Sequence, residues 1–299
     1  MAADPAPPRI VREAAPAKVN LYLHVVGRRA DGYHLVDSLV AFAAIGDSIE
    51  AKPAPGLSLA IDGPFAGDAP ADGTNLVLAA AERLRAAAGG GGAAIRLTKR
   101  LPVAAGIGGG SADAAAALRA LRRLWRPRGG IDLRPLAGAI GADVPMCLAR
   151  RPARIAGIGE VVTPVPAFPM LPAVLVNPGV PLATADVFRG RAGTFGAPAP
   201  ALPAWRDAAD LVAWLEPLRN DLTETAVRLV PAVGEALRAL AGAEGCRLAR
   251  MSGSGATCLG LFDTMRAARL AARRIRRHQP RWWVKSTTLA AAREPRVED

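Results

Sequence analysis

The sequence predicts an α+β protein with two domains. Candidate strands and helices are interleaved along the chain, but not in the strict β-α-β order that a doubly wound parallel sheet requires. Four prolines fall within Pro164–Pro172, which favours a domain boundary there. The chain has 299 residues, of which 51% are hydrophobic, enough to bury one large core or two ordinary ones. We therefore expect two domains, at residues 1–165 and 166–299, that share a cleft.

The first half contains most of the predicted strands. Strands are expected where apolar residues alternate between turn-forming residues, and helices where a polar cap precedes an alanine-rich run. Asp31-Gly32 predicts a turn, Thr74 is the expected cap of the first helix, and Gly89–Gly92 is expected to end that helix. The predicted strands are Arg9–Ala14, Val19–Val26, Ile45–Ala51, Leu57–Ile61 and Ala93–Lys99, and a hairpin is predicted at Arg154–Thr163. The predicted helices are Asn75–Ala88, Ala112–Trp125, Leu133–Ile140 and one that opens at Gly141–Pro145.

The second half alternates strands and helices again. Gly190–Pro203 is rich in glycine, alanine and proline, which predicts a surface loop. Thr264 is the expected cap of the last helix. The predicted strands are Ala173–Asn177, Cys246–Met251, Ala256–Phe262 and Trp282–Leu289. The predicted helices are Thr184–Phe188, Ala208–Leu215, Asp221–Leu229, Pro231–Leu240 and Thr264–Arg277.

The net charge of +12 comes almost wholly from arginine, because the chain contains only four lysines. A basic chain is typical of nucleic-acid-binding proteins. Here, however, the arginines are scattered, with no run of five basic residues and no interleaved aromatic residues. Excess positive charge also suits an enzyme whose substrates are polyphosphates, so the charge alone does not decide the function.

Cys147, Cys246 and Cys258 are odd in number and widely spaced, which argues against a disulfide framework or a zinc site. The N-terminus lacks the apolar segment of a signal peptide, and no run reaches the ~18 apolar residues of a membrane span. We expect a soluble, cytoplasmic protein with no membrane partner and no metal bound by protein ligands.

Leu101–Leu118 is the stretch around which the chain is organised. A predicted strand leads into it and a predicted helix leads out. Free N–H groups at a helix N-terminus, with the positive end of the helix dipole behind them, form an anion site. Ser111 is placed to cap the helix, or to offer its hydroxyl to phosphate or Mg²⁺. A tight turn alone needs fewer glycines than the four found here, Gly106, Gly108, Gly109 and Gly110.

This loop lacks two common nucleotide-binding patterns. G-x-x-x-x-G-K-[ST] fails because the loop has no Gly-Lys pair, and G-x-G-x-x-G fails because Ser111 stands where the last glycine should be. The loop instead resembles the phosphate loop of the GHMP small-molecule kinases, P-x-x-x-G-[LI]-G-G-[GS]-S. Six more stretches match in one order along nearly the whole chain: A-P-A-K-V-N-L-Y-L at Ala15–Leu23, R-A-D-G-Y-H at Arg29–His34, G-A-D-V-P at Gly141–Pro145, P-G-V at Pro178–Val180, N-D-L at Asn220–Leu222 and S-G-S-G-A at Ser252–Ala256.

Within the superfamily, D-G-Y-H combined with A-P-A-K-x-N resembles the branch that acts on a cytidine diphosphate-linked sugar alcohol. That branch works on the non-mevalonate route to isoprenoid precursors. The resemblance implies transfer of a phosphoryl group from ATP, with Mg²⁺, to the 2-hydroxyl of that alcohol. It also implies the two-domain GHMP kinase fold, with an N-terminal domain like ribosomal protein S5 domain 2 and a ferredoxin-like C-terminal domain.

The resemblance assigns catalysis to Asp143 and Lys18. Asp143 would be the general base that takes the proton from the attacking hydroxyl. Its position alone is equally consistent with a cap of the helix that starts at Val144-Pro145. Lys18 would orient Asp143 and offset the negative charge that builds between the hydroxyl and the γ-phosphate. A lone lysine at a strand end can also simply be solvated. Asp113 could be a Mg²⁺ ligand, or could only favour the helix dipole.

The same resemblance implies which residues bind the two substrates. Tyr33 and His34 would hold the cytosine by stacking and hydrogen bonding, with Phe188 as a second aromatic wall. Asn20 and Thr184 are polar candidates for the sugar and the diphosphate. The nucleotide-binding residues would be Asn75, Lys99 and the loop residues Pro102, Val103, Ala104, Ala105, Gly106, Ile107, Gly108, Gly109, Gly110, Ser111 and Ala112.

The phosphate loop departs from the family's common pattern, P-x-G-x-G-[LI]-G-G-G-S-S. This chain has Ala104-Ala105 before Gly106 and Ala112 after Ser111. Alanine tolerates most backbone conformations except positive φ, so we expect the later glycines to cradle phosphate unaided. The departure leaves open any side-chain contact from position 112.

Two other classes of function remain open at this stage. One is a GHMP kinase for homoserine, mevalonate or a related alcohol, although those substrates carry no base for the aromatic residues to stack on. The other is a protein associated with nucleic acid or the ribosome, because the N-terminal fold also occurs there. We expect a small-molecule substrate, no nucleic-acid partner, and a monomer or weak homodimer.

Overall fold

The computed structural model describes residues 10–127 and 129–290, and the descriptions below concern that part of the chain. Its first two strands, β1 (Val11–Arg28) and β2 (His34–Pro53), form a long antiparallel hairpin that closes at the predicted Asp31-Gly32 turn. The sequence predicted β1 as two shorter strands, and of β2 it predicted only Ile45–Ala51. The ladder continues past Pro16 because its register shifts there: the partner of Pro16 is Gly46 and that of Lys18 is Phe42, so the extra residues lie on β2, and the missing N–H of proline is tolerated at such an irregularity. Gly46 pairs with Pro16, and a Cβ there would meet the carbonyl oxygen of Ala15.

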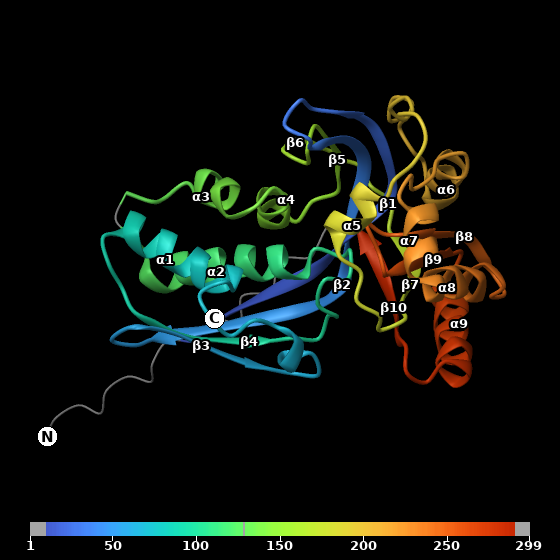
Figure 1. The fold of residues 1–299 in the computed structure, drawn as a ribbon. Coiled ribbons are helices and arrows are strands. Elements are labelled where there is room, and N and C mark those ends of the chain that lie inside the picture. The colour runs from blue at the N-terminus through green and yellow to red at the C-terminus, as the bar shows by residue number, and fades with distance from the viewer. Residues whose placement is uncertain (1–9, 128, 291–299) are drawn as a thin grey trace, which may run out of the picture.

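The rest of the N-terminal half packs helices on this hairpin. In chain order the elements are β3 (Leu57–Asp62), the short η1 (Ala66–Asp68), α1 (Leu76–Ala88), β4 (Ala93–Thr98), α2 (Gly109–Trp125), α3 (Leu133–Ile140), α4 (Val144–Ala149) and the hairpin strands β5 (Ala153–Ala156) and β6 (Val161–Pro164). Figure 1 shows α1 and α2 along one face of the sheet, with α3 and α4 on the far side of α2. The small alanines of α2 are buried, so the helix lies close against β1 and β2.

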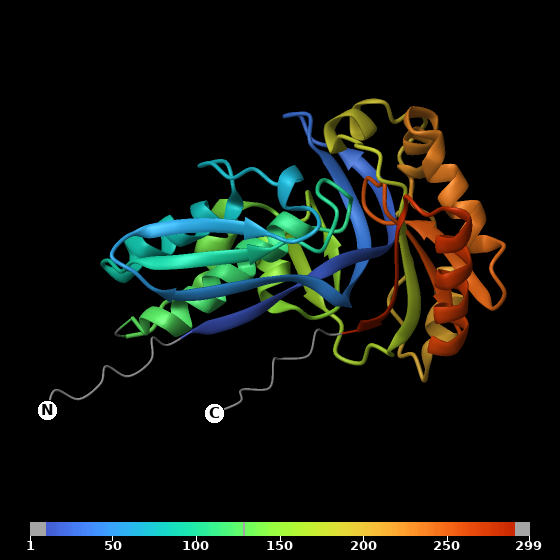
Figure 2. The same ribbon diagram turned by 90° about the horizontal axis from the view of Figure 1, so that it is seen from below.

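The C-terminal half has the predicted ferredoxin-like topology. After β7 (Leu171–Asn177) come α5 (Thr184–Arg189), α6 (Ala208–Leu215), α7 (Thr223–Leu229), α8 (Pro231–Ala241), β8 (Cys246–Met251), β9 (Cys258–Phe262), α9 (Met265–His278) and β10 (Trp283–Ala290). The strands lie in the order β10-β7-β9-β8, all antiparallel, which is the β-α-β-β-α-β arrangement. Figure 2 shows the orange and red helices of this half on the outer side of its strands. Val174 and Val176 of β7 face that helical layer.

The two halves share a sheet and a core. The last strand, β10, pairs with β7 along its length and with β2 at its end, where Leu289 lies opposite Ala43. The opposite face of β7 packs into a cluster of buried residues drawn from both halves. This cluster includes Leu175 together with Leu21 of β1 and Leu215 of α6. The α+β, two-domain fold is therefore confirmed. The boundary between residues 165 and 166 falls in the connector between β6 and β7, and it stays a prediction.

Thr74, the expected cap of the first helix, and Ser111, one of whose two suggested roles was a cap, do not cap a helix. Asn75, not Thr74, caps α1 by accepting a hydrogen bond from the backbone N–H of Val77, while Thr74 donates to Asp72. Ser111 does not cap α2. That helix begins at Gly109 and its cap position is Gly108, because Gly109 and Gly110 adopt helical backbone conformations despite being glycines. The expected cap at Thr264 is confirmed, since its side chain accepts a hydrogen bond from the backbone N–H of Ala267 at the start of α9.

Several simpler predictions are confirmed. Gly89 ends α1 in the left-handed conformation, β5 and β6 form the predicted hairpin, and Gly190–Pro203 contains neither helix nor strand. The three cysteines are free, and burial raises the pKa of Cys258 and Cys147 to about 12. In residues 10–127 and 129–290, every helix is too short or too polar to cross a membrane.

Candidate active site

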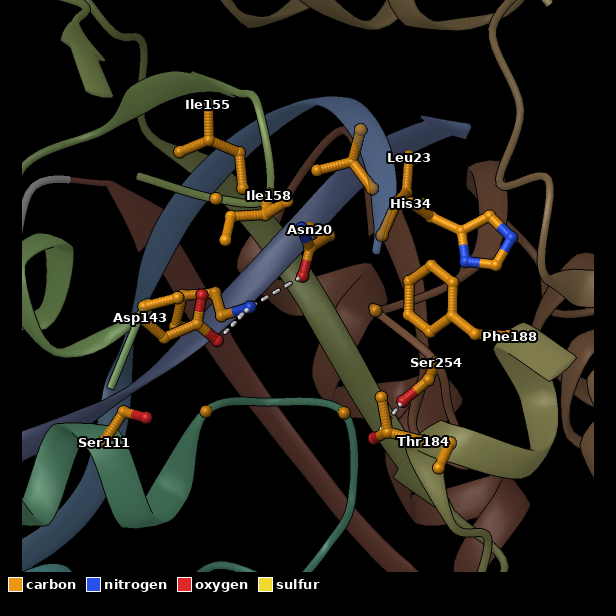
Figure 3. Close-up of a pocket in the computed structure, with 18 of the residues that line it drawn as sticks. Asn20, Leu23, His34, Ser111, Asp143, Ile155, Ile158, Thr184, Phe188 and Ser254 are labelled. Atoms are coloured by element: carbon orange, nitrogen blue, oxygen red, sulfur yellow. Dashed lines mark hydrogen bonds and ion pairs between the residues drawn. The ribbon is translucent and has the colours of Figure 1, made fainter. Parts of the chain in front are cut away.

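One cavity of about 940 Å³ brings together segments that are far apart in the sequence. It is lined by β1, the turn before β2, the phosphate loop, the N-terminus of α4, α5, and the loop between β8 and β9. Figure 3 shows Asp143 and Ser111 at one end of this cavity, and His34 and Phe188 at the other. Its volume is in the range of small-molecule sites. Five of the recognised motifs therefore contribute residues to one shared cavity, whereas Pro178–Val180 and Asn220–Leu222 are not among its lining residues.

Lys18 and Asp143 form an ion pair in this cavity. The ammonium of Lys18 lies 3.0 Å from a carboxylate oxygen of Asp143 and donates to the side-chain oxygen of Asn20 at 3.1 Å (Figure 3). The side chain of Lys18 is only 7% exposed, whereas that of Asp143 is 33% exposed to the cavity. Asp143 occupies the N-cap position of α4, but its side chain makes no capping hydrogen bond. The carboxylate is thus directed at Lys18 and the cavity, away from the helix backbone.

The phosphate loop is tied to β1 and to the loop between β8 and β9. The backbone N–H of Lys18 donates to the carbonyl of Ile107 at 2.9 Å. The Ser252 hydroxyl donates to the carbonyl of Gly106 at 3.0 Å and accepts from the backbone N–H of Asn20, also at 3.0 Å. These contacts fix the loop relative to the Lys18–Asp143 pair.

Glycine is required in this loop at two positions. Gly106 has φ +72°, and a Cβ there would lie 2.5 Å from the carbonyl oxygen of Ser252 and 2.6 Å from that of Gly255. Gly108 has φ +61°, and its Cβ would lie 3.1 Å from the side chain of Lys18. Both positions combine the left-handed conformation with a close approach of neighbouring atoms. Gly109 and Gly110 are helical, and a Cβ would lie 3.4 Å from the Lys99 ammonium at Gly109 and 3.7 Å from Leu76 at Gly110, so the backbone conformation does not require glycine at either position.

Ala104 corrects one expectation about the loop. Its φ is +50°, in the left-handed region that the sequence interpretation assumed alanine would not have to enter. This is the first position at which the common family pattern has a glycine. The loop therefore keeps its conformation at the cost of a strained alanine, which costs roughly 1 kcal/mol.

We expect Ala104→Gly to raise the stability of the protein by up to about 1 kcal/mol, because glycine relieves the left-handed strain. Ala105→Gly is the matched control, since Ala105 does not have positive φ and should lose ~0.5–1 kcal/mol through backbone entropy. Thermal and denaturant unfolding of both variants checks this. Destabilisation by both substitutions alike would contradict it.

Lys99 is held below the loop by two carboxylates. Its ammonium lies 2.5 Å from Asp47 and 2.8 Å from Asp113, and all three side chains are almost completely buried. Burial opposes the charge of Lys99, but the attraction of Asp113 and Asp47 outweighs it and raises the pKa of Lys99. Burial raises the pKa of Asp113 against the attraction of Lys99, and the charge of Asp47 adds to the rise.

Asp47 also accepts hydrogen bonds from the backbone N–H groups of Arg100 and Leu101, where the phosphate loop begins. This buried triad of Asp47, Lys99 and Asp113 therefore anchors the base of the loop and the first turn of α2. Among the cavity-lining residues neither Lys99 nor Asp113 is present.

Other predicted nucleotide-binding residues also lie behind the lining. Asn75 is buried as the cap of α1 and donates to the carbonyl of Pro70. Pro102, Val103, Ile107 and Ala112 are absent from the residues that line the cavity, whereas Ala104, Ala105, Gly106, Gly108, Gly109, Gly110 and Ser111 line it. The seven loop residues that line the cavity could contact a nucleotide without any rearrangement of the loop.

The far end of the cavity is aromatic. The rings of His34 and Phe188 are 5.2 Å apart with an interplanar angle of 31°, and Phe195 meets His34 edge-on at 6.3 Å. Tyr33 also lines the cavity and is 62% exposed. Burial lowers the pKa of His34, and the charges of Arg28 and Arg191 lower it further, so the ring is neutral at pH 7. A neutral imidazole both donates and accepts hydrogen bonds, as recognition of a base edge requires.

Some residues in the site were not predicted. One of them is Ser254, which shares a 2.8 Å hydrogen bond with the predicted residue Thr184 (Figure 3). Ser252 and Ser254 belong to the recognised S-G-S-G-A stretch, whose hydroxyls could have been proposed as ligands. Ile155 and Ile158 form an apolar wall. Nothing in their sequence context distinguishes them from core residues.

Residues 75–151 match the N-terminal domain of the GHMP kinases, and residues 199–281 match their C-terminal domain. Together with the fold and the cavity, these matches show that the chain belongs to the GHMP kinases. The chain is 56% identical to 4-diphosphocytidyl-2-C-methyl-D-erythritol kinase from Paramagnetospirillum magneticum, over 92% of this chain and 97% of that protein. It is 49% identical to the enzyme of the same name from Roseobacter denitrificans, with 97% of each chain covered.

A crystal structure of 4-(cytidine 5'-diphospho)-2C-methyl-D-erythritol kinase superposes with a TM-score of 0.78 at 37% identity, covering 93% of this chain and 99% of that one. Within the GHMP kinases, the chain therefore belongs to the 4-diphosphocytidyl-2-C-methyl-D-erythritol kinase family. A homoserine kinase from Cytophaga hutchinsonii matches with a TM-score of 0.71 at 19% identity, covering 95% of this chain and 96% of that one, which shows a shared fold alone.

Proposed function

We propose that the protein transfers the γ-phosphoryl group of ATP to the 2-hydroxyl of 4-diphosphocytidyl-2-C-methyl-D-erythritol, on the non-mevalonate route to isoprenoid precursors. One observation carries this most strongly. The Lys18–Asp143 pair lies in a cavity that has a phosphate loop at one end and the His34–Phe188 aromatic pair at the other. ATP and a cytidine-linked alcohol would therefore meet at the ion pair.

Asp143 is the proposed general base. Its carboxylate faces the cavity, where it is paired with Lys18, and it makes no hydrogen bond to the backbone of α4. It accepts the hydroxyl proton while the hydroxyl oxygen bonds to the γ-phosphorus and the bond from that phosphorus to the bridging oxygen of ADP breaks. Phosphoryl transfer depends mainly on positioning and charge, so one oriented carboxylate is sufficient chemistry.

Lys18 is proposed to orient Asp143 and to stabilise the transferred group. Two contacts hold its ammonium, one to Asp143 and one to Asn20. An ammonium has three N–H donors, so one remains for a phosphate oxygen. The backbone of Lys18 is bound to Ile107 of the phosphate loop, which keeps this donor beside the place where the γ-phosphate would lie.

The loop residues would hold the ATP phosphates through the backbone N–H groups at the N-terminus of α2, a helix of 17 residues. Mg²⁺ fits this site as an ion carried mainly by phosphate oxygens and water. When bound, it would neutralise phosphate charge. Ser111 lines the cavity and is the hydroxyl able to approach it, whereas the carboxylate of Asp113 is engaged by Lys99.

The aromatic end would bind the cytosine, and Tyr33→Ala tests this assignment. We expect a rise in KM for the cytidine substrate of about tenfold or more, because stacking on a base contributes ~1–3 kcal/mol, with KM for ATP unchanged. Tyr33→Phe is the matched control and should retain most of the affinity. Tyr33 is largely exposed, so the core is not disturbed. An effect confined to ATP would mean that the two ends of the cavity are reversed.

We further propose a small-molecule kinase that works in the cytoplasm as a monomer or weak homodimer, without a nucleic-acid or membrane partner. A coupled ADP-release assay tests the function directly, with a panel of alcohols that includes the cytidine substrate, homoserine and mevalonate. Turnover restricted to the cytidine-linked alcohol is expected. Equal or better turnover of homoserine or mevalonate would contradict the assigned substrate, and salt-dependent RNA binding without ATP turnover would contradict the assigned class.

A further inference from the structure

The amide of Asn20 is engaged at both ends. Its oxygen accepts a hydrogen bond from the ammonium of Lys18 at 3.1 Å, and its nitrogen donates to the hydroxyl of Ser38 at 2.8 Å. Asn20 is 1% exposed and Ser38 is completely buried. Bulk water therefore cannot substitute for either partner. The chain of contacts Ser38–Asn20–Lys18–Asp143 leads from β2 to the exposed carboxylate.

The Ser38 hydroxyl decides which way the amide points. A hydroxyl carries one hydrogen, and here that hydrogen is donated to the carbonyl of Tyr22. The oxygen of Ser38 is thereby left only as an acceptor towards Asn20, so it must face the NH₂ end of the amide. The C=O end then faces Lys18, whose ammonium has donors but no acceptor. Rotating the amide by half a turn would place two donors against each other at Lys18 and two acceptors against each other at Ser38.

The strand geometry keeps Ser38 in this place. Ser38 lies on β2 opposite Leu23 of β1, next to the bulge between Asn20 and Tyr22. A bulge changes the direction of the backbone locally, and bulges often lie beside active sites. The Tyr22 carbonyl belongs to the same strand that carries Lys18 and Asn20. The hydroxyl thus connects the backbone of β1 to the side chain that holds the ammonium.

We propose that Ser38 is a positioning residue for phosphoryl transfer. It acts through Asn20, whose amide oxygen it directs at Lys18, and so it keeps the ammonium against Asp143. Its catalytic consequence rests on the proposed function. No contact between Ser38 and a substrate is required, because Ser38 does not line the cavity.

Ser38→Thr and Ser38→Val form the matched pair that tests this. Threonine and valine have almost the same shape, so they differ essentially in the hydroxyl, and both suit a strand. We expect Ser38→Val to have a kcat about tenfold below that of Ser38→Thr, because valine can neither accept the hydrogen bond from Asn20 nor donate one to the Tyr22 carbonyl. KM for ATP should be the same in both. Equal kcat values for the two variants would overturn the proposal.

A second comparison separates positioning from a general structural defect. If Ser38 acts through Asn20, the tenfold difference between Ser38→Thr and Ser38→Val should disappear when Asn20→Ala is present in both. Persistence of the full difference without Asn20 would overturn the proposal. If the added methyl prevents folding, Ser38→Ala against the wild type gives the same test, and an unchanged kcat would overturn it.

The alcohol that the wild-type protein phosphorylates is identified first, so that the proposed function and the proposed role of Ser38 are tested separately. Absence of turnover with the cytidine substrate counts against the proposed function alone. The Ser38 comparison is then made with whichever alcohol of the panel is phosphorylated. A tenfold difference with that alcohol would support Ser38 as a positioning residue for a different substrate.

Discussion

Replacing Asp143 by asparagine is expected to lower kcat by roughly 10²–10⁴-fold, the usual contribution of a general base. The amide keeps the shape of the side chain but cannot accept the proton of the hydroxyl. The variant should still fold, because the Asp143 side chain makes no hydrogen bond to the backbone of α4 and the amide oxygen of asparagine can still accept a hydrogen bond from Lys18. Affinity for a non-hydrolysable ATP analogue should also change little, since the phosphate loop is intact.

Asp132→Asn is the matched control for this experiment. Asp132 caps α3 with its side chain and is not among the residues that line the cavity. Asparagine is also a good cap, so this variant loses a carboxylate charge without losing kcat. Measured at saturating ATP and alcohol, near-normal turnover by Asp143→Asn would remove Asp143 from the chemistry.

Replacing Gly106 by alanine is expected to weaken binding of an ATP analogue by two orders of magnitude or more and to lower stability. The new Cβ would lie within 2.6 Å of two backbone oxygens, those of Ser252 and Gly255. Backbone atoms cannot move aside as a flexible side chain can, and φ at this position is +72°. Strain alone contributes roughly 1–3 kcal/mol, and the displacement of the phosphate loop adds to it.

Gly138→Ala in α3 is the control, because nothing lies within 4 Å of the added Cβ and alanine favours a helix. It should leave ATP binding unchanged. Gly109→Ala separates the effect on phosphate binding from the effect on stability. Gly109 is helical, and the atom nearest to its added Cβ would be the ammonium nitrogen of Lys99, at 3.4 Å. Titration calorimetry should show weaker binding by Gly109→Ala with little loss of melting temperature. Normal binding by both Gly106→Ala and Gly109→Ala would contradict the assignment of this loop to phosphate.

The fold was predictable from the sequence except where long-range pairing overrides a local signal. Helices and turns were mostly placed correctly, because caps and glycines act within a few residues. The first strand, β1, was predicted as two strands because Pro16 ordinarily interrupts a strand, and the shift in register after the Pro16–Gly46 pair lets the ladder continue. Ala104 was misjudged because its positive φ is imposed by the loop as a whole.

The candidate site was predictable where it consists of short motifs. The sequence pointed to Lys18, Asp143 and the glycine loop, and the structure brings them together. It gave no sign of Ser38, or of Asp47 below the loop, because their partners lie on other strands and neither residue type is unusual in its context. Such contacts depend on the register between strands, which a single sequence does not specify.

The most direct measurement of the central claim is the structure of the product. Incubation of the wild-type protein with ATP, Mg²⁺ and the cytidine-linked alcohol should yield ADP and a product heavier by one phosphoryl group. Phosphorus and carbon NMR should place that group on the 2-hydroxyl, with the diphosphate intact. A phosphoryl group on the cytidine, or ADP release without a phosphorylated alcohol, would contradict the proposed alignment of the two substrates at Asp143.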